Sequence, residues 1–164
     1  FAEQFNALGG RFIFCVNRQE LAFQFNSLIK KSDWQKVYCI ENRIKEIVGT
    51  SAEERFTDKD LANCDVSVTG CEWLVARTGS IVMSAAQTSG RTTSVYAPIH
   101  ICIAFTSQLV YDVKDALTAI KEKYNELPSL ITFATGPSRT ADIEKTLVVG
   151  VHGPKEVYCF LVDA

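Results

Sequence analysis

The chain has 164 residues, of which 47% are hydrophobic and 22% charged, and its formal net charge is −2. This length fits one domain, and the composition excludes a disordered or low-complexity protein. Lys and Arg number 17 against 19 Asp and Glu, so the chain lacks the basic excess of a dedicated nucleic-acid binder. No apolar run approaches the ~20 residues that span a bilayer, so we expect no membrane insertion.

The first ten residues, FAEQFNALGG, are typical of the end of a helix closed by Gly9 and Gly10. Because the chain begins with Phe1, we expect some preceding residues to be missing. Whether these residues include a signal peptide is left open by the sequence. The whole range 1–164 is predicted to be a single domain.

Short apolar strands then alternate with helical patterns. RFIFCV (11–16) and KVYCI (36–40) are predicted to be buried strands. Between them, Asn17 and Glu20 resemble a capping box at the start of a helix, and a shorter helix is predicted to end at Gly49. This order favours parallel strands with helical crossovers.

The middle of the chain differs from this alternation. DVSVTG, CEWLVA and SIVMSA are short β-prone runs, residues 87–94 indicate a polar loop, and YAPIHICIAF (96–105) predicts a strand. A helix capped by Asp112, a strand over 129–135, a short helix around 139–147 and a strand over 156–162 complete the pattern. We therefore predict a three-layer, Rossmann-like α/β domain with a mixed, mostly parallel sheet.

The six cysteines show no metal or redox spacing. Four lie inside apolar runs, and Cys64 and Cys71 flank another. No pair is spaced C-x-x-C, and no ferredoxin-like run is present. We interpret them as small buried hydrophobes of a reducing, cytoplasmic compartment, with a disulfide or metal role as the alternative. No cofactor and no metal is predicted for the chain.

The strongest local candidate for a site is Thr135-Gly136-Pro137-Ser138-Arg139-Thr140. The segment follows a predicted strand and opens a predicted helix, where free N–H groups suit an anion. The guanidinium of Arg139 matches a carboxylate or a phosphate. Asp142 and Glu144, just downstream, are either ordinary acids in a first helical turn, where the helix dipole stabilises them, or one of them pairs with Arg139 and orients its guanidinium toward the pocket. The alternative is an ordinary strand-to-helix turn with a solvated arginine.

The two histidines have different settings. His100 lies inside a strand, where a buried histidine with its hydrogen bonds satisfied is the commoner explanation. His152 lies in the loop Gly150-Val151-His152-Gly153-Pro154, and loops often carry function. His152 is therefore the better candidate for a general acid or base.

Two segments resemble the LUD-domain family of LutC-type lactate utilisation proteins. They are DLANCDVSVTGCEWLVARTGSIVMSA (60–85) and TGPSRTADIEKTLVVGVHGPKEVYCFLV (135–162). The resemblance implies the NagB/RpiA/CoA transferase-like fold. It also implies a bacterial, non-redox component of lactate oxidation to pyruvate, with iron–sulfur and other redox proteins as partners. Family members usually read Ala-Glu-Thr-Gly-Thr where this chain has Ala76-Arg77-Thr78-Gly79-Ser80, so a carboxylate is replaced by a base that favours a more anionic ligand.

The resemblance implies one pocket for a small carboxylate or phosphate. It assigns candidate catalytic roles to His152, Asp142 and Glu144, and candidate binding roles to Thr78, Gly79, Ser80, Gly136, Pro137, Ser138, Arg139, Thr140 and Gly153. Two other hypotheses stay open. One is a stand-alone enzyme acting on a small phosphorylated or acyl-CoA-type substrate, and the other is a homo-oligomer with a degenerate site and a structural or regulatory role. The sequence does not decide whether the chain is an enzyme.

Overall fold

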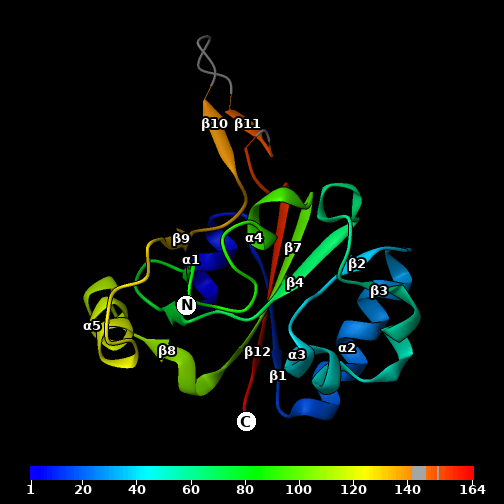
Figure 1. Cartoon of the computed structure of the whole chain (residues 1–164), viewed down its shortest axis with the longest axis horizontal. Helices are drawn as coiled ribbons and strands as arrows, with labels where there is room; N and C mark the ends of the chain where they lie inside the picture. The colour runs from blue at the N-terminus through cyan, green and yellow to red at the C-terminus, as the bar shows by residue number, and fades with distance from the viewer. Residues whose placement is uncertain (142–146, 151) are drawn as a thin grey trace.

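A parallel sheet forms the centre of the computed structural model, which describes residues 1–141, 147–150 and 152–164 (Figure 1). Within these residues the sheet has six parallel strands in the order β1-β12-β7-β4-β2-β3. They are β1 (Arg11–Cys15), β2 (Val37–Tyr38), β3 (Phe56–Thr57), β4 (Val66–Thr69), β7 (Ile99–Phe105) and β12 (Glu156–Val162). Strands covered on both faces have nearly continuous apolar sequences, which is why these runs were recognisable.

Two helices cover one face of this sheet, α2 (Arg18–Lys31) and α3 (Asn42–Val48). Leu21, Phe25 and Ile29 of α2 pack in one buried cluster with strand residues such as Ile101 and Phe160. The predicted cap of α2 is confirmed, because the Glu20 amide donates to Asn17 Oδ1 at 2.8 Å. Short 3-10 turns follow at Thr50–Arg55, Leu61–Asn63 and Thr106–Gln108.

A second, smaller sheet covers the opposite face (Figure 1). Its order among the described strands is β8-β5-β6-β9. The strands are β5 (Trp73–Val75), β6 (Ser80–Ser84), β8 (Leu109–Val110) and β9 (Ile131–Ala134). Leu74 and Ile81 face the central sheet, whereas Val75 and Val82 pack against α5 (Val113–Lys123). Alternate residues therefore serve two different cores.

The remaining elements are a short helix and a hairpin, which precede β7 and β12 in the chain, and the first helix. Helix α4 (Thr93–Tyr96) occupies the end of the region predicted to be a polar loop, and strands β10 (Arg139–Ala141) and β11 (Leu147–Val149) form an antiparallel hairpin. Helix α1 (Ala2–Ala7) buries Phe5 against the second sheet and ends before Gly9, whose φ is +89°.

The predicted α/β fold class is confirmed, and the described strands of the central sheet are all parallel. The antiparallel pairs that make the architecture mixed lie in the second sheet and the hairpin. All six cysteines are free and buried, as predicted. Among the described helices, none combines the length and the apolar character that a membrane span requires.

Candidate functional site

The helix predicted around residues 139–147 is wrong. Residues 139–141 and 147–149 are strands, with Thr140 paired to Val148. Both flanks carry β-branched residues, which suit a strand better than a helix. The segment 136–140 therefore has no helix N-terminus to present to an anion, and the Ser138 amide donates instead to the Pro154 carbonyl at 2.9 Å.

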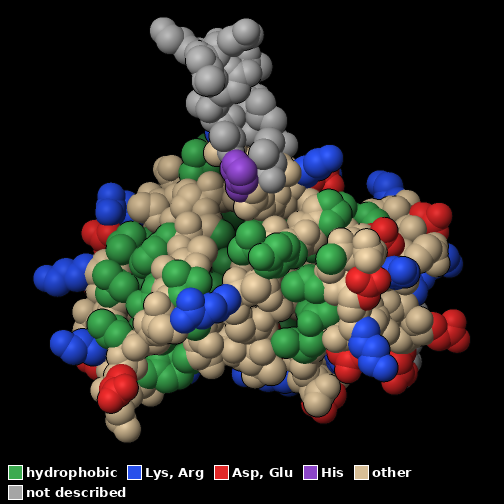
Figure 2. Space-filling model, turned by 45° about the horizontal axis from the view of Figure 1, so that its top comes forward, with side chains coloured by type: hydrophobic (Ala, Val, Ile, Leu, Met, Phe, Trp, Pro, Cys, Tyr) green, Lys and Arg blue, Asp and Glu red, His purple; other side chains and the backbone are tan. Residues whose placement is uncertain are grey.

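The loops around the hairpin nevertheless enclose a cavity of about 330 Å³. Five of the predicted residues line it: Gly136, Pro137, Ser138, His152 and Gly153. Its floor includes His100 and Val157, the second residues of β7 and β12. The cavity thus lies at the amino ends of two strands of the central parallel sheet, β7 and β12. Figure 2 turns this edge toward the reader and shows a histidine at the surface.

The turn at residues 77–80 reaches this region through a chain of hydroxyl groups. Thr78 Oγ1 lies 2.7 Å from Ser80 Oγ, which lies 2.8 Å from Thr135 Oγ1. Of these three, Thr135 lines the cavity. Gly79 has a φ of +68°, and a Cβ there would lie 2.6 Å from the Phe5 amide nitrogen. The turn therefore supports the cavity wall and α1 rather than facing a ligand directly.

Neither of the two arginines considered in the sequence, Arg77 and Arg139, lines the cavity. Arg139 donates to the Leu8 carbonyl at the end of α1, so its guanidinium is engaged by backbone. Arg77 pairs with Asp112 at 2.7 Å, on the surface beside α5. The idea that Arg77 selects a more anionic ligand in this pocket is therefore wrong. Asp142 and Glu144 lie outside the described residues.

His100 is a fully buried member of the cavity floor. Its Nε2 lies 2.8 Å from Thr69 Oγ1. Burial lowers the pKa of His100 from 6.5 to about 4, so the ring is neutral at pH 7. This agrees with the interpretation of His100 as a satisfied buried histidine, whereas His152, which also lines the cavity, is exposed.

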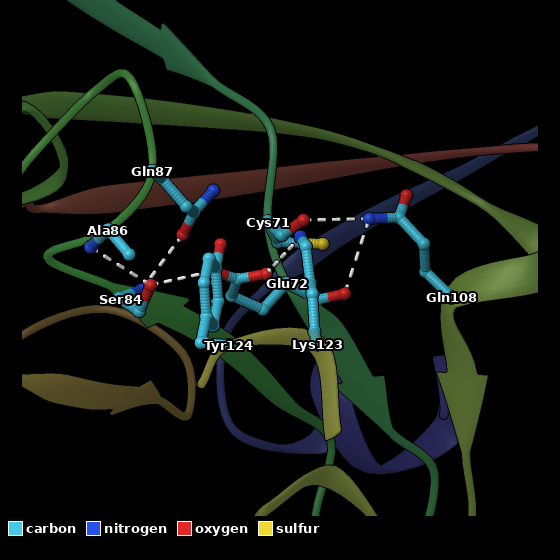
Figure 3. Close-up of polar contacts among 8 residues, drawn as sticks. All are labelled: Cys71, Glu72, Ser84, Ala86, Gln87, Gln108, Lys123 and Tyr124. Carbon is cyan, nitrogen blue, oxygen red and sulfur yellow. Dashed lines mark hydrogen bonds and ion pairs between the residues drawn. The ribbon is translucent and has the colours of Figure 1, made fainter. Parts of the chain in front are cut away.

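Sequence reasoning missed a second polar cluster, centred on Glu72 (Figure 3). The Glu72 side chain is fully buried and accepts hydrogen bonds from Ser84 Oγ (2.6 Å), Tyr124 Oη (2.6 Å) and Lys123 Nζ (2.7 Å). Gln108 Nε2 holds the same turn by donating to the Cys71 carbonyl at 2.7 Å. An acid three residues after the strand that ends at Thr69 was the available signal, but its apolar surroundings indicated packing.

Opposing effects set the ionisation of Glu72. Burial raises the pKa of Glu72, but hydrogen bonds from Lys123, Ser84 and Tyr124 outweigh it and hold the pKa below its ordinary value. The carboxylate is therefore charged at neutral pH and paired with a half-exposed ammonium group. Such a group beside a cavity is a candidate functional residue as well as a structural one.

Comparison with known proteins shows which family the chain resembles. The model of the LUD domain matches residues 1–162. A "Lactate utilization protein C" of Anoxybacillus flavithermus is 30% identical over 156 residues, covering 94% of this chain and 64% of that protein. The protein of the same name from Bacillus subtilis is 35% identical over 114 residues, covering 68% and 47%.

Two further similarities complete the comparison. An uncharacterized protein of Neisseria meningitidis serogroup B is 34% identical over 95 residues, covering 58% of this chain and 41% of that protein. The crystal structure of a DUF162 family protein from Deinococcus radiodurans has a TM-score of 0.70 at 21% identity, covering 98% of this chain and 94% of that chain. The chain spans about half the length of the curated relatives it matches.

Proposed function

The chain belongs to the LUD domain family, and we propose that it acts in bacterial lactate utilisation as a non-redox component of lactate oxidation to pyruvate. The names of its relatives support the process. The absence of cluster-type cysteine spacing in the sequence supports a role beside iron–sulfur and other redox partners rather than in their place.

The cavity below the hairpin is the proposed binding site for a small carboxylate or phosphate. The observation that carries this proposal is the convergence of Gly136, Pro137, Ser138, His152 and Gly153 on one space of about 330 Å³. That volume lies at the lower end of the range for ligand cavities, so it suits a metabolite of a few carbon atoms. The Ser138 hydroxyl and the His152 imidazole supply hydrogen bonds to an oxyanion.

Growth of a deletion strain on L-lactate tests the proposed role in the cell. Deleting the native gene should abolish growth on L-lactate while leaving growth on pyruvate intact, and the tagged protein should co-purify with iron–sulfur proteins. Growth on lactate that is unaffected by the deletion would refute the role.

Two matched variants test the cavity. His152→Ala should reduce lactate-dependent growth, whereas Lys155→Ala should not, because Lys155 is exposed in the same loop but does not line the cavity. Equal growth of the two variants on lactate would show that lactate utilisation does not depend on this cavity.

A further inference from the structure

A second cavity, of about 550 Å³, lies at the opposite edge of the central sheet. It is bordered by the carboxyl ends of β2, β4 and β7, by the start of α3 and by the end of α5. Parallel α/β sheets commonly bind ligands at this edge, where loops diverge from the strand ends. The cavity adjoins the Glu72 cluster, and its wall includes Ile40, Ile103 and Phe105.

Two cations on this cavity have hydrogen-bond donors to spare. Lys123 Nζ carries three N–H donors, one of which is directed at Glu72, and its side chain is 54% exposed. Arg43 is exposed and lies over the Phe105 ring, 5.1 Å from its centroid. Across residues 1–141, 147–150 and 152–164, no hydrogen bond or ion pair engages the Arg43 guanidinium. Both groups can therefore donate to an oxyanion.

One carboxylate on the cavity has an oxygen to spare. Glu41 Oε1 accepts a hydrogen bond from the Gly70 amide at 3.0 Å, and no described residue donates to Oε2. A Cβ on Gly70 would lie 3.1 Å from Glu41 Oε2, so glycine permits this close approach. An anionic acceptor with a free oxygen favours a ligand that brings a hydroxyl hydrogen.

The charges on the wall select between kinds of anion. Glu41 and Glu72 balance Arg43 and Lys123, so the four charged groups sum to zero. A dianion would bring a second negative charge close to the Glu41 carboxylate, whereas a monoanion with a hydroxyl group satisfies both the spare donors and the spare acceptor. The isoleucine and phenylalanine wall suits a short hydrocarbon part.

We propose that this second cavity binds a small hydroxycarboxylate. The ligand carboxylate accepts hydrogen bonds from Arg43 and Lys123, and the ligand hydroxyl donates to Glu41 Oε2. Glu72 is a positioning residue, because its buried carboxylate holds the ammonium group of Lys123 at the cavity wall. The site is distinct from the cavity lined by His152, and neither depends on the other.

Amide NMR of the ¹⁵N-labelled chain tests this proposal with two probes, L-lactate and propionate, which differ by the hydroxyl group. L-Lactate should shift the Gly70 amide resonance, and propionate should bind at least tenfold more weakly, because the Glu41 acceptor stays unused. Equal affinities for the two acids, or an unshifted Gly70 resonance, would overturn the proposal. Shifts confined to Gly136 and Gly153 would do the same while supporting the cavity at the hairpin.

A pair of arginine variants provides the matched control. Arg43→Gln should weaken L-lactate binding about tenfold, because it removes a charged donor from the cavity. Arg18→Gln should leave the affinity unchanged, since Arg18 also lies over the Phe105 ring but does not line this cavity. An Arg43→Gln protein that is folded, with its other amide resonances unchanged, and that binds L-lactate normally would overturn the assignment of Arg43.

Discussion

Replacing Glu72 by alanine should destabilise the protein strongly. The substitution leaves the Ser84 and Tyr124 hydroxyls without their acceptor, although each lies 2.6 Å from the carboxylate. A hydrogen bond to a charged group contributes about 1.5–3 kcal/mol, so the two together give about 3–6 kcal/mol. Lys123 adds little to this sum, because its side chain is half exposed and water screens the pair.

Urea unfolding followed by circular dichroism measures this loss as a change in the free energy of unfolding. Glu72→Gln should fall between the wild type and Glu72→Ala, because the amide keeps an acceptor oxygen but not the charge. Arg77→Ala provides the control: it breaks an ion pair of the same 2.7 Å length with Asp112, but at the surface, and should behave like the wild type. A Glu72→Ala protein that loses less than about 1 kcal/mol would refute this account of the cluster.

Three further outcomes are expected. The folded-state pKa of Glu72 lies below the ordinary value of 4.5. The charged carboxylate therefore stabilises the fold above pH 4.5, and this stabilisation is lost as the pH falls through the folded-state pKa. The difference in melting temperature between the wild type and Glu72→Gln should accordingly become smaller in acid. The pKa of His100 in the folded protein is about 4 instead of 6.5, so the unfolded chain takes up a proton at this residue first as the pH falls. The free energy of unfolding should therefore rise by about 3 kcal/mol between pH 4 and pH 6.5 in the wild type. The His100→Gln variant should show no such rise. Gly79→Ala should cost more than about 1 kcal/mol and more than Gly90→Ala, because the two glycines share the same φ region but a Cβ at Gly90 meets nothing within 4 Å. Equal losses at the two glycines in thermal unfolding would contradict the contact with α1.

The main strands of the central sheet and the helices that cover it could be predicted from the sequence alone. The run at 156–162 is apolar throughout because β12 is covered on both faces, and its bounds coincide with the prediction. The α2 cap was equally local, since Asn17 and Glu20 are three residues apart. Features set by neighbouring residues were therefore predictable.

The site depended on contacts that no local pattern reveals. Glu72 meets Lys123 and Tyr124 across 51 and 52 positions of the chain. The orientation of Arg139 depends on the Leu8 carbonyl, 131 positions away, and the same segment pairs as a hairpin rather than starting a helix. A glycine-containing turn after a strand has the same local sequence whether a helix or a hairpin follows, and only the pairing of the next residues distinguishes the two.

The position of β12 has a consequence for how the chain folds. This strand lies between β1 and β7, so it fills the gap between two strands that are synthesised before it, one of which lies close to residue 1. Until it emerges from the ribosome, β1 has no strand to pair with in the central sheet, and the facing edge of β7 presents unpaired backbone groups. Pairing over such sequence separations is slow, so we expect completion of the sheet to limit the folding rate.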